Sequence, residues 1–331
     1  MQYFLIILGC LIYIGVVCDI LKTTLSMQGS GWLTIKFSHF FWNVMLVLSG
    51  RDGKSKFLAK AGFYLLIKII LIWVSLLVLS LFLLLLADVD SIVNAAKIPG
   101  SVLDKLYYAG FVVSTLGIGD FTPSNDLWRV ITDIYAFTGL ILITMSVTYF
   151  IPVLSAVIKQ RKLGINLSNL GDSVEKIILN VINGNDYTFF KIQLLNYSDA
   201  LLEHNQNHRA YPVIHFFHNS DKEHSIIIQV ARLNEAVYVM ENFLKSEYSI
   251  PEQELSSIRT SLDNHIKVIE EVSNIKVNQE PPKMVSLSLL EEKGLLKDNW
   301  NSLALSKNTQ HKRAMFLTLI ERDGWNWNDI T

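Results

Sequence analysis

The chain has 331 residues, of which 50% are hydrophobic, with a mean hydropathy of +0.32 and a formal net charge of −1. This composition is too apolar for an ordinary soluble domain and too polar for a chain that lies in the membrane throughout, so it indicates a membrane part joined to a soluble part. The near-zero charge gives no basis for nucleic-acid binding. Cys10 and Cys18, the two cysteines, both lie in the first apolar run, where they can build neither a disulfide framework nor a metal site.

Residues 1–20 contain an apolar run that begins near the N-terminus. No basic residue precedes it and no small-residue cleavage site follows it, which argues against a removable signal. We therefore expect a retained transmembrane helix with Met1 on the outer side.

Residues 21–60 carry six basic side chains against the single acid Asp52, an excess that predicts a cytoplasmic loop. Within it, residues 32–49 are apolar except for a polar stripe at spacings of three and four. This pattern favours a helix lying in the membrane interface. An additional span is the alternative, and it would move Met1 to the cytoplasm.

Residues 61–87 form the clearest predicted span, because the stretch 69–87 holds no charge. The loop that follows is acidic and is expected to face outward. A further span is predicted over residues 127–158, and the bases just after it return the chain to the cytoplasm. The segment between the two spans, residues 101–114, has apolar side chains at helical spacing but is too short to cross a bilayer.

The short helix leads into Thr-Leu-Gly-Ile-Gly-Asp at residues 115–120. A dehydrated cation needs several oxygens at once, and successive carbonyls point the same way only where the backbone tolerates positive φ. Gly117 and Gly119 stand at the alternate positions that this geometry needs. Thr115 adds a hydroxyl oxygen, and Asp120 places a carboxylate at the mouth.

In this setting the hexapeptide resembles the filter of the potassium channel superfamily, usually T-V-G-Y-G-D, in its prokaryotic two-transmembrane form. The resemblance implies a pore domain over 61–160. Together with the extra N-terminal transmembrane helix and the all-helical cytoplasmic domain expected from the sequence pattern, it predicts an all-α membrane protein. Four identical chains would surround one axis, since each chain supplies a single filter segment. The residues that would bind the permeant ion are Thr115, Leu116, Gly117, Ile118 and Gly119.

The pore departs from the family at two positions. Ile118 replaces the usual Tyr, and Phe111 stands where some members have an acid. A filter that is looser and less selective for K+ is therefore an alternative. Tyr107 occupies the place of a Trp that braces the filter, and we expect its hydroxyl to donate a hydrogen bond to Asp120. Anchoring at the membrane interface is the alternative for Tyr107.

In the inner helix, Gly139 falls where family members have a hinge glycine, and close helix packing is the alternative. Pro152 removes a backbone hydrogen bond, so a kink is expected there. Asp133 is expected either to bond behind the filter, to a pore-helix hydroxyl, or to face outer water. By the same resemblance, one face of this helix lines the cavity, and its residues are Leu140, Ile143, Val147 and Ile151. An apolar ring at Ile151 could close the pore by excluding water.

Residues 161–331 show helical periodicity and are predicted to form an all-helical cytoplasmic domain. Helices are expected within 171–184, 225–244, 251–272 and 306–322. A nucleotide-binding domain of Rossmann type is excluded by the lack of G-x-G-x-x-G.

Histidines crowd one part of this domain, in pairs at one-turn helical spacing: His204 with His208, and His215 with His218. Such pairs can bind a transition metal or sense pH between about 5 and 8. Ordinary surface and core histidines are the alternative, because no Cys or carboxylate completes a ligand shell.

The sequence thus predicts a homotetrameric channel that conducts K+ passively across the cell membrane. The tail would assemble or gate it, with a cytoplasmic ligand or protein partner that the sequence does not identify. A weakly selective monovalent cation channel and a membrane-anchored scaffold or sensor are the alternatives. No catalytic motif is present, so no enzyme is predicted, and K+ is expected as permeant ion with no resident cofactor.

Overall fold

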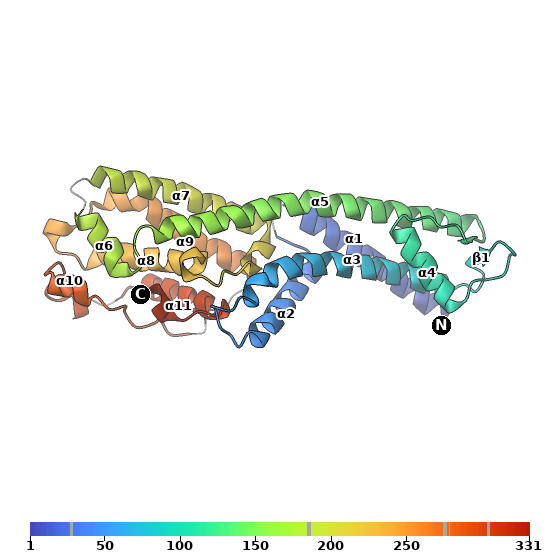
Figure 1. Cartoon of the computed structure of the whole chain (residues 1–331), viewed down its shortest axis with the longest axis horizontal. Helices are drawn as coiled ribbons and strands as arrows, with labels where there is room; N and C mark the ends of the chain where they lie inside the picture. The colour runs from blue at the N-terminus through green and yellow to red at the C-terminus, as the bar shows by residue number, and fades with distance from the viewer. Residues whose placement is uncertain (27–28, 184–186, 274–276, 278, 303–304) are drawn as a thin grey trace. The chain divides into compact units, whose positions relative to one another are not determined.

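The protein is an all-α membrane protein, as expected, and its helices are drawn in Figure 1. It separates into two units. The membrane unit comprises Met1–Phe40 and Phe63–Val153, and the C-terminal unit comprises Phe41–Gly62 and Leu154–Thr331. The computed structural model describes all residues except 27–28, 184–186, 274–276, 278 and 303–304.

Three described helices are long and apolar enough to cross a membrane. They are α1 (Gln2–Leu25), α3 (Ala61–Leu86, after a short 3-10 turn at Leu58–Lys60) and α5 (Asp126–Ser168). The helix α2 (Trp32–Leu48) has 17 residues and falls short of that length. An interfacial position of α2 is compatible with this length and stays a prediction.

Small and hydroxyl-bearing side chains let α1, α3 and α5 pack closely in the membrane unit. Ser80 of α3 lies 2.8 Å from the carbonyl of Gly9 and 2.5 Å from the hydroxyl of Tyr135 in α5. A methyl group at Gly9 would meet Leu84 at 2.9 Å, so glycine permits this approach. Such polar contacts and small residues replace the hydrophobic driving force that is missing between helices in lipid.

Asp19 is a buried carboxylate that determines where α2 begins. Its Oδ1 accepts a hydrogen bond from the backbone N–H of Leu33 at 2.9 Å, in the first turn of α2. Its Oδ2 accepts from the Thr34 hydroxyl at 2.5 Å and from the indole N–H of Trp73 in α3 at 3.0 Å. An ionisable side chain inside an apolar helix requires such partners, and Asp19 was not among the residues predicted to matter.

The segment between α3 and α5 contains the expected short helix, α4 (Val102–Val113). Ser101 and Asp104 form a reciprocal capping box at its start, which explains why the helix begins there. The strands β1 (Ile92–Asn94) and β2 (Phe121–Pro123), which were not predicted, pair antiparallel and pin the two ends of this region together.

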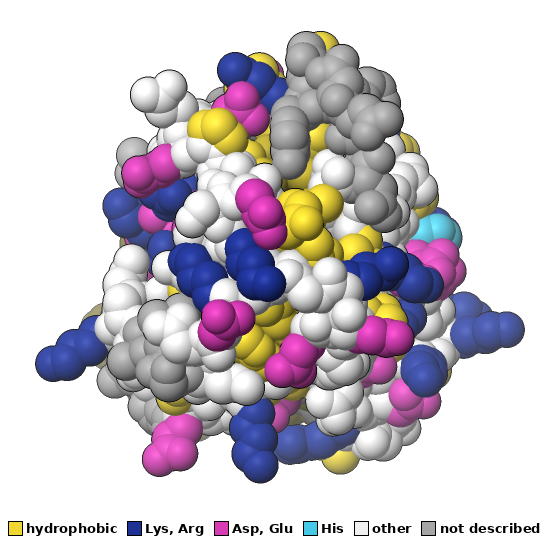
Figure 2. Space-filling view, turned by 90° about the vertical axis from the view of Figure 1, so that its left-hand side faces the viewer, with side chains coloured by type: hydrophobic (Ala, Val, Ile, Leu, Met, Phe, Trp, Pro, Cys, Tyr) yellow, Lys and Arg dark blue, Asp and Glu magenta, His cyan; other side chains and the backbone are white. Residues whose placement is uncertain are grey.

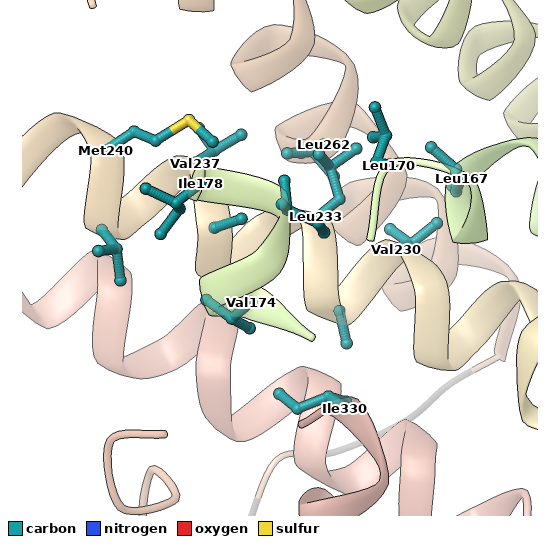
Figure 3. Close-up of a cluster of buried hydrophobic side chains, with 14 of the residues drawn as sticks. Leu167, Leu170, Val174, Ile178, Val230, Leu233, Val237, Met240, Leu262 and Ile330 are labelled. Carbon is teal, nitrogen blue, oxygen red and sulfur yellow. The ribbon is translucent and has the colours of Figure 1, made fainter. Parts of the chain in front are cut away.

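The C-terminal unit is a helical domain, and its core is shown in Figure 3. The helix α8 contacts α6, α9 and α11, and α7 lies along α9. All four predicted helices are present, and α7 is a further long helix. Their bounds are α6 Val174–Asn183, α7 Tyr187–Ala210, α8 Ile226–Asn242, α9 Glu252–Ser273, α10 Ser288–Glu292 and α11 Lys307–Arg322.

Two boundaries differ from those expected. The inner helix α5 runs on to Ser168, past the predicted end at 158, because Leu163 and Leu167 pack into the core of the C-terminal unit. The chain 41–62 groups with the C-terminal unit, although its sequence suggested only a loop that bears an interfacial helix.

Buried arginines hold the C-terminal unit together. Arg313 of α11 pairs with Glu235 of α8 at 2.9 Å, and both side chains are buried. Arg232 of α8 donates to the carbonyl of Ile330 at 2.7 Å and so ties the chain end to the core. Outside, Figure 2 shows one end of the unit, where basic and acidic side chains alternate around small hydrophobic patches. On that face, no single sign of charge dominates.

Candidate functional site

Along residues 115–119, the sign of the backbone φ angle alternates from one residue to the next. Thr115, Gly117 and Gly119 have φ values of 59°, 58° and 84°, whereas Leu116 and Ile118 between them keep ordinary negative φ. Alternation of this kind can turn successive carbonyls toward one side, which is the geometry that a dehydrated cation needs.

Thr115 carries backbone strain in this segment. Positive φ at a β-branched residue is uncommon and costs about 1–3 kcal/mol. The end of α4 holds the residue there, since the N–H of Thr115 donates to the Val112 carbonyl at 3.0 Å and that of Leu116 to the Phe111 carbonyl at 2.9 Å. Strain of this size is typical of functional positions.

A buried lysine fixes α4 against the end of α3. The ammonium group of Lys105 donates to the carbonyls of Leu85, Asp88 and Val89 at 2.9, 2.5 and 3.1 Å. Burial lowers the pKa of Lys105, and the nearby carboxylates of Asp88 and Asp90 oppose that effect. The sequence signal for this contact is a lysine in a largely apolar short helix, and Lys105 was not among the predicted site residues.

Aromatic side chains lie behind the segment. Partial desolvation raises the pKa of the Tyr107 hydroxyl, and the nearby charge of Asp120 raises that pKa further. The ring of Phe111 packs edge-on against Tyr107 and Tyr108, with centroids 5.3 and 4.9 Å away. Phe111, which we predicted to replace an acid of the potassium channel superfamily, is therefore part of an aromatic cluster.

Tyr108 links α4 to the inner helix. Its buried hydroxyl lies 2.8 Å from the Thr132 hydroxyl of α5. This is the kind of bond that we considered for Asp133, whose side chain is exposed in the single chain. Thr132, one residue earlier, therefore makes the contact to the pore-helix hydroxyl.

Gly139 lies at a close contact between α5 and α4. A Cβ atom there would stand 1.9 Å from the Val113 carbonyl oxygen, which no side chain can tolerate. Close packing, the alternative to a hinge, is thus a sufficient reason for glycine. The helix α5 stays helical through Gly139 and Pro152, so hinge and kink both remain predictions.

The predicted cavity face of α5 is uncovered in the single chain. On the opposite face Leu142, Tyr149 and Val153 are buried. The segment 115–120 is likewise exposed, so one chain encloses neither a cavity nor an ion path. The exposed fractions of the cavity-face residues are 52% for Leu140, 50% for Ile143, 57% for Val147 and 67% for Ile151.

The histidines of the C-terminal unit form spatial groups that differ from the pairs predicted from their sequence spacing. His204, His208 and His215 come together with His265 of α9, which local spacing could not reveal. His218 lies apart, with Nε2 2.7 Å from the Gly53 carbonyl and Nδ1 2.9 Å from Asp323. Within the described ranges, no group of three His, Cys, Asp or Glu side chains is arranged to hold a metal ion.

Comparison with known proteins places these features in a family. Residues 63–156 match the sequence model of a family described as "Ion channel", and this range contains α4, the segment 115–120 and most of α3. The chain is 31% identical to the "Uncharacterized membrane protein YdjJ" of Bacillus subtilis (strain 168), over 97% of this chain and 94% of that protein. The chain belongs to the same membrane-protein family. No solved structure matches it.

The family match and the geometry concern the same residues. The chain is a membrane protein with an ion-channel region, and its apolar helices contact the lipid bilayer. An ion-channel match points to transport and away from catalysis.

Proposed function

We propose that the protein is a potassium-selective channel in the cell membrane, through which K+ flows passively. The observation that carries this proposal is the alternation of positive φ at Thr115, Gly117 and Gly119 within a region that matches an ion-channel family. Carbonyls of residues 115–119, with the Thr115 hydroxyl, replace the hydration shell of K+. Potassium is the permeant ion, and the channel needs no resident cofactor.

Four chains assemble around the pore. One chain supplies one segment, and both that segment and the face of α5 from Leu140 to Ile151 are exposed when the chain is alone. A closed ring of identical chains surrounds the ion with carbonyls and turns the apolar face of α5 toward a common cavity.

In the proposed topology the chain crosses the membrane three times, and its two ends lie on opposite sides. The basic residues 51–60 and 159–162 stay inside by the positive-inside rule, which puts the C-terminal unit in the cytoplasm and Met1 outside. In this topology α2 lies in the inner interface, and the C-terminal unit assembles or gates the pore.

Potassium flux into proteoliposomes tests the pore through a matched pair of variants. The described structure leaves open space for a methyl group at both Gly117 and Gly15, but only Gly117 has positive φ. Gly117→Ala therefore strains the filter backbone, and we expect K+ flux to fall at least about tenfold. Gly15→Ala, in α1, should leave flux unchanged. Full flux through Gly117→Ala would disprove the assignment.

A weakly selective cation channel is the second candidate, and Ile118 favours it. Its side chain is 51% exposed and carries no hydroxyl to brace the filter against α4. Reversal potentials in mixed K+ and Na+ decide between the two candidates. A potential that follows K+ alone supports the selective channel, and one that moves equally with Na+ supports the weaker one.

A further inference from the structure

Four histidines meet inside the C-terminal unit. His204 and His208 extend from α7, His265 from α9 and His215 from the 3-10 turn Pro212–Phe216. Ring centroids lie 5.9 Å apart for His204 and His208, 5.7 Å for His204 and His265, and 5.5 Å for His208 and His215. The rings of His204, His208 and His265 are at most 5% exposed.

The cluster lies directly against the end of the inner helix. Gln160 of α5 lines the same small cavity, of about 20 Å³, as the four histidines. The Gln160 Oε1 atom and the Nδ1 atoms of His204 and His208 are buried without a hydrogen-bond partner among the described residues. Buried polar atoms without partners are rare in native proteins and call for an explanation.

Besides the four histidines, the described side chains that line the cavity are neutral. These side chains are Gln160 from α5, Ile226 and Ile227 from α8, Ile269 from α9 and Leu319 from α11. His265 Nδ1 lies 2.7 Å from the Asn205 Oδ1 atom, which is also neutral. The charged neighbours along α7 and α9 form pairs away from the cavity: Glu203 with Lys159, Arg209 with Glu271, and Asp263 with Lys312.

This environment favours neutral imidazoles. Burial, reinforced by the neighbouring histidines, lowers the pKa of His204 and of His265 to about 3 and holds that of His208 well below its usual value. Among the described residues that line the cavity, no carboxylate is present to stabilise an imidazolium.

We propose that the histidine cluster is a proton-binding switch that releases α7 and α9 from the end of α5 when the cytoplasm becomes acidic. When neutral, the cluster packs against Gln160. When protonated, it places like charges in a site whose described lining holds no carboxylate, and the contact opens. Because α5 also carries the cavity-lining residues, the switch acts on the pore, and this last step rests on the proposed channel function.

The direction of the pH effect follows from linkage. A histidine whose pKa is low in the packed state and near 6.5 in the opened state stabilises packing fully above about pH 6.5. Below that pH, each histidine favours opening about tenfold per pH unit, so three buried histidines give up to about a thousandfold per unit. The effect continues until the packed-state pKa of about 3 is reached.

Hydrogen exchange of the full-length protein in lipid nanodiscs, corrected for intrinsic rates, tests the switch between pH 7.5 and 5.0. The wild type should lose protection of α7 and α9 amides below about pH 6.5, with an uptake of about three protons. The double variant His204→Gln/His265→Gln should retain an uptake of about one proton. His311→Gln, on the exposed side of α11, should behave as the wild type, because that ring is paired with Glu270 at the surface.

Three results would overturn the proposal. The first is full protection down to pH 5, and the second is an unchanged proton uptake in the double variant. The third is a rise in protection when zinc alone is added at pH 7.5 to the wild type but not to the double variant, which would make the cluster a metal site. If the double variant is already unprotected at pH 7.5, the single variant His208→Gln is used instead. Its proton uptake should be about one proton smaller than that of the wild type.

Potassium flux at varied internal pH then connects the switch to the pore. Flux should change below about pH 6.5 in the wild type and change much less steeply with pH in the double variant, which keeps only His208 among the three buried histidines. Absence of flux at every pH would contradict the proposed channel while leaving the exchange result intact. The two failures are therefore distinguishable.

Discussion

Asp19 shows how much one side chain determines in the membrane unit. Its two oxygens accept hydrogen bonds from the first turn of α2 and from Trp73 of α3, so a single carboxylate joins three helices. Gly31 leaves it room, because a Cβ atom there would stand 1.9 Å from Asp19 Oδ1. Hydrogen bonds to a charged group contribute about 1.5–3 kcal/mol each, more than neutral ones do.

Asp19→Asn tests this role at nearly constant size. The amide keeps one acceptor for Leu33 but replaces the oxygen that accepts from Thr34 and Trp73, so we expect a loss of roughly 1–3 kcal/mol of stability. Thermal unfolding in detergent should show a melting temperature several degrees lower. The control Asp126→Asn removes a carboxylate that is 93% exposed, and it should change stability by less than about 0.5 kcal/mol. Equal melting of the two variants would refute the role of Asp19.

At the scale of elements, the chain between α2 and α3 is docked on the C-terminal unit. Gly53 donates its N–H to the Gly324 carbonyl at 2.7 Å, and its own carbonyl lies 2.7 Å from His218 Nε2. The Trp325 ring covers Gly53 so closely that a Cβ atom would meet it at 2.5 Å. The indole of Trp42 in α2 donates to the Arg322 carbonyl at 3.1 Å. The segment that leads into the outer helix is thereby part of the same unit as the tail.

This docking should weaken as pH rises. Burial alone would lower the pKa of His218, but the charge and hydrogen bond of Asp323, with the Gly53 carbonyl, raise it above the usual value. The stabilisation is therefore complete below about pH 6.5 and is lost as pH rises through the raised pKa. Hydrogen exchange of residues 51–57 should accelerate between pH 6 and 8.5 beyond the intrinsic change.

Two variants separate His218 from other sources of pH dependence. His218→Gln can still donate to Gly53 but cannot become charged, so its exchange should be faster at pH 6 and show no excess pH dependence. His224→Gln, on a surface turn beside Asp221, should leave the wild-type profile unchanged. A wild-type profile in His218→Gln would refute the docking role. This histidine and the buried cluster respond to pH in opposite directions, because His218 faces Asp323 whereas the described lining of the cluster holds no carboxylate.

At the scale of the whole molecule, assembly follows from what a single chain leaves uncovered. The segment 115–120 and the apolar face of α5 are both exposed, and neither can enclose an ion by itself. We expect native mass spectrometry of the detergent-solubilised protein to find four chains. Monomers or dimers at concentrations that support flux would contradict the proposed pore.

Much of the membrane unit could be predicted from the sequence, because its signals are local. Apolar runs located the three long helices, the pattern of residues 101–114 predicted α4, and the glycines at 117 and 119 fall at positions of positive φ. In the tail, periodicity predicted four helices correctly. Bilayer thickness and backbone sterics act on neighbouring residues, so the sequence by itself determined these elements.

Contacts between distant residues were decided only by the tertiary structure. Spacing grouped His218 with the other histidines, whereas packing of α9 on α7 replaces it with His265. Likewise Gly139 lies against the Val113 carbonyl, Asp19 anchors α2, and the chain 41–62 joins the tail. Periodicity shows which face of a helix is apolar, but the partner of that face depends on how the helices pack.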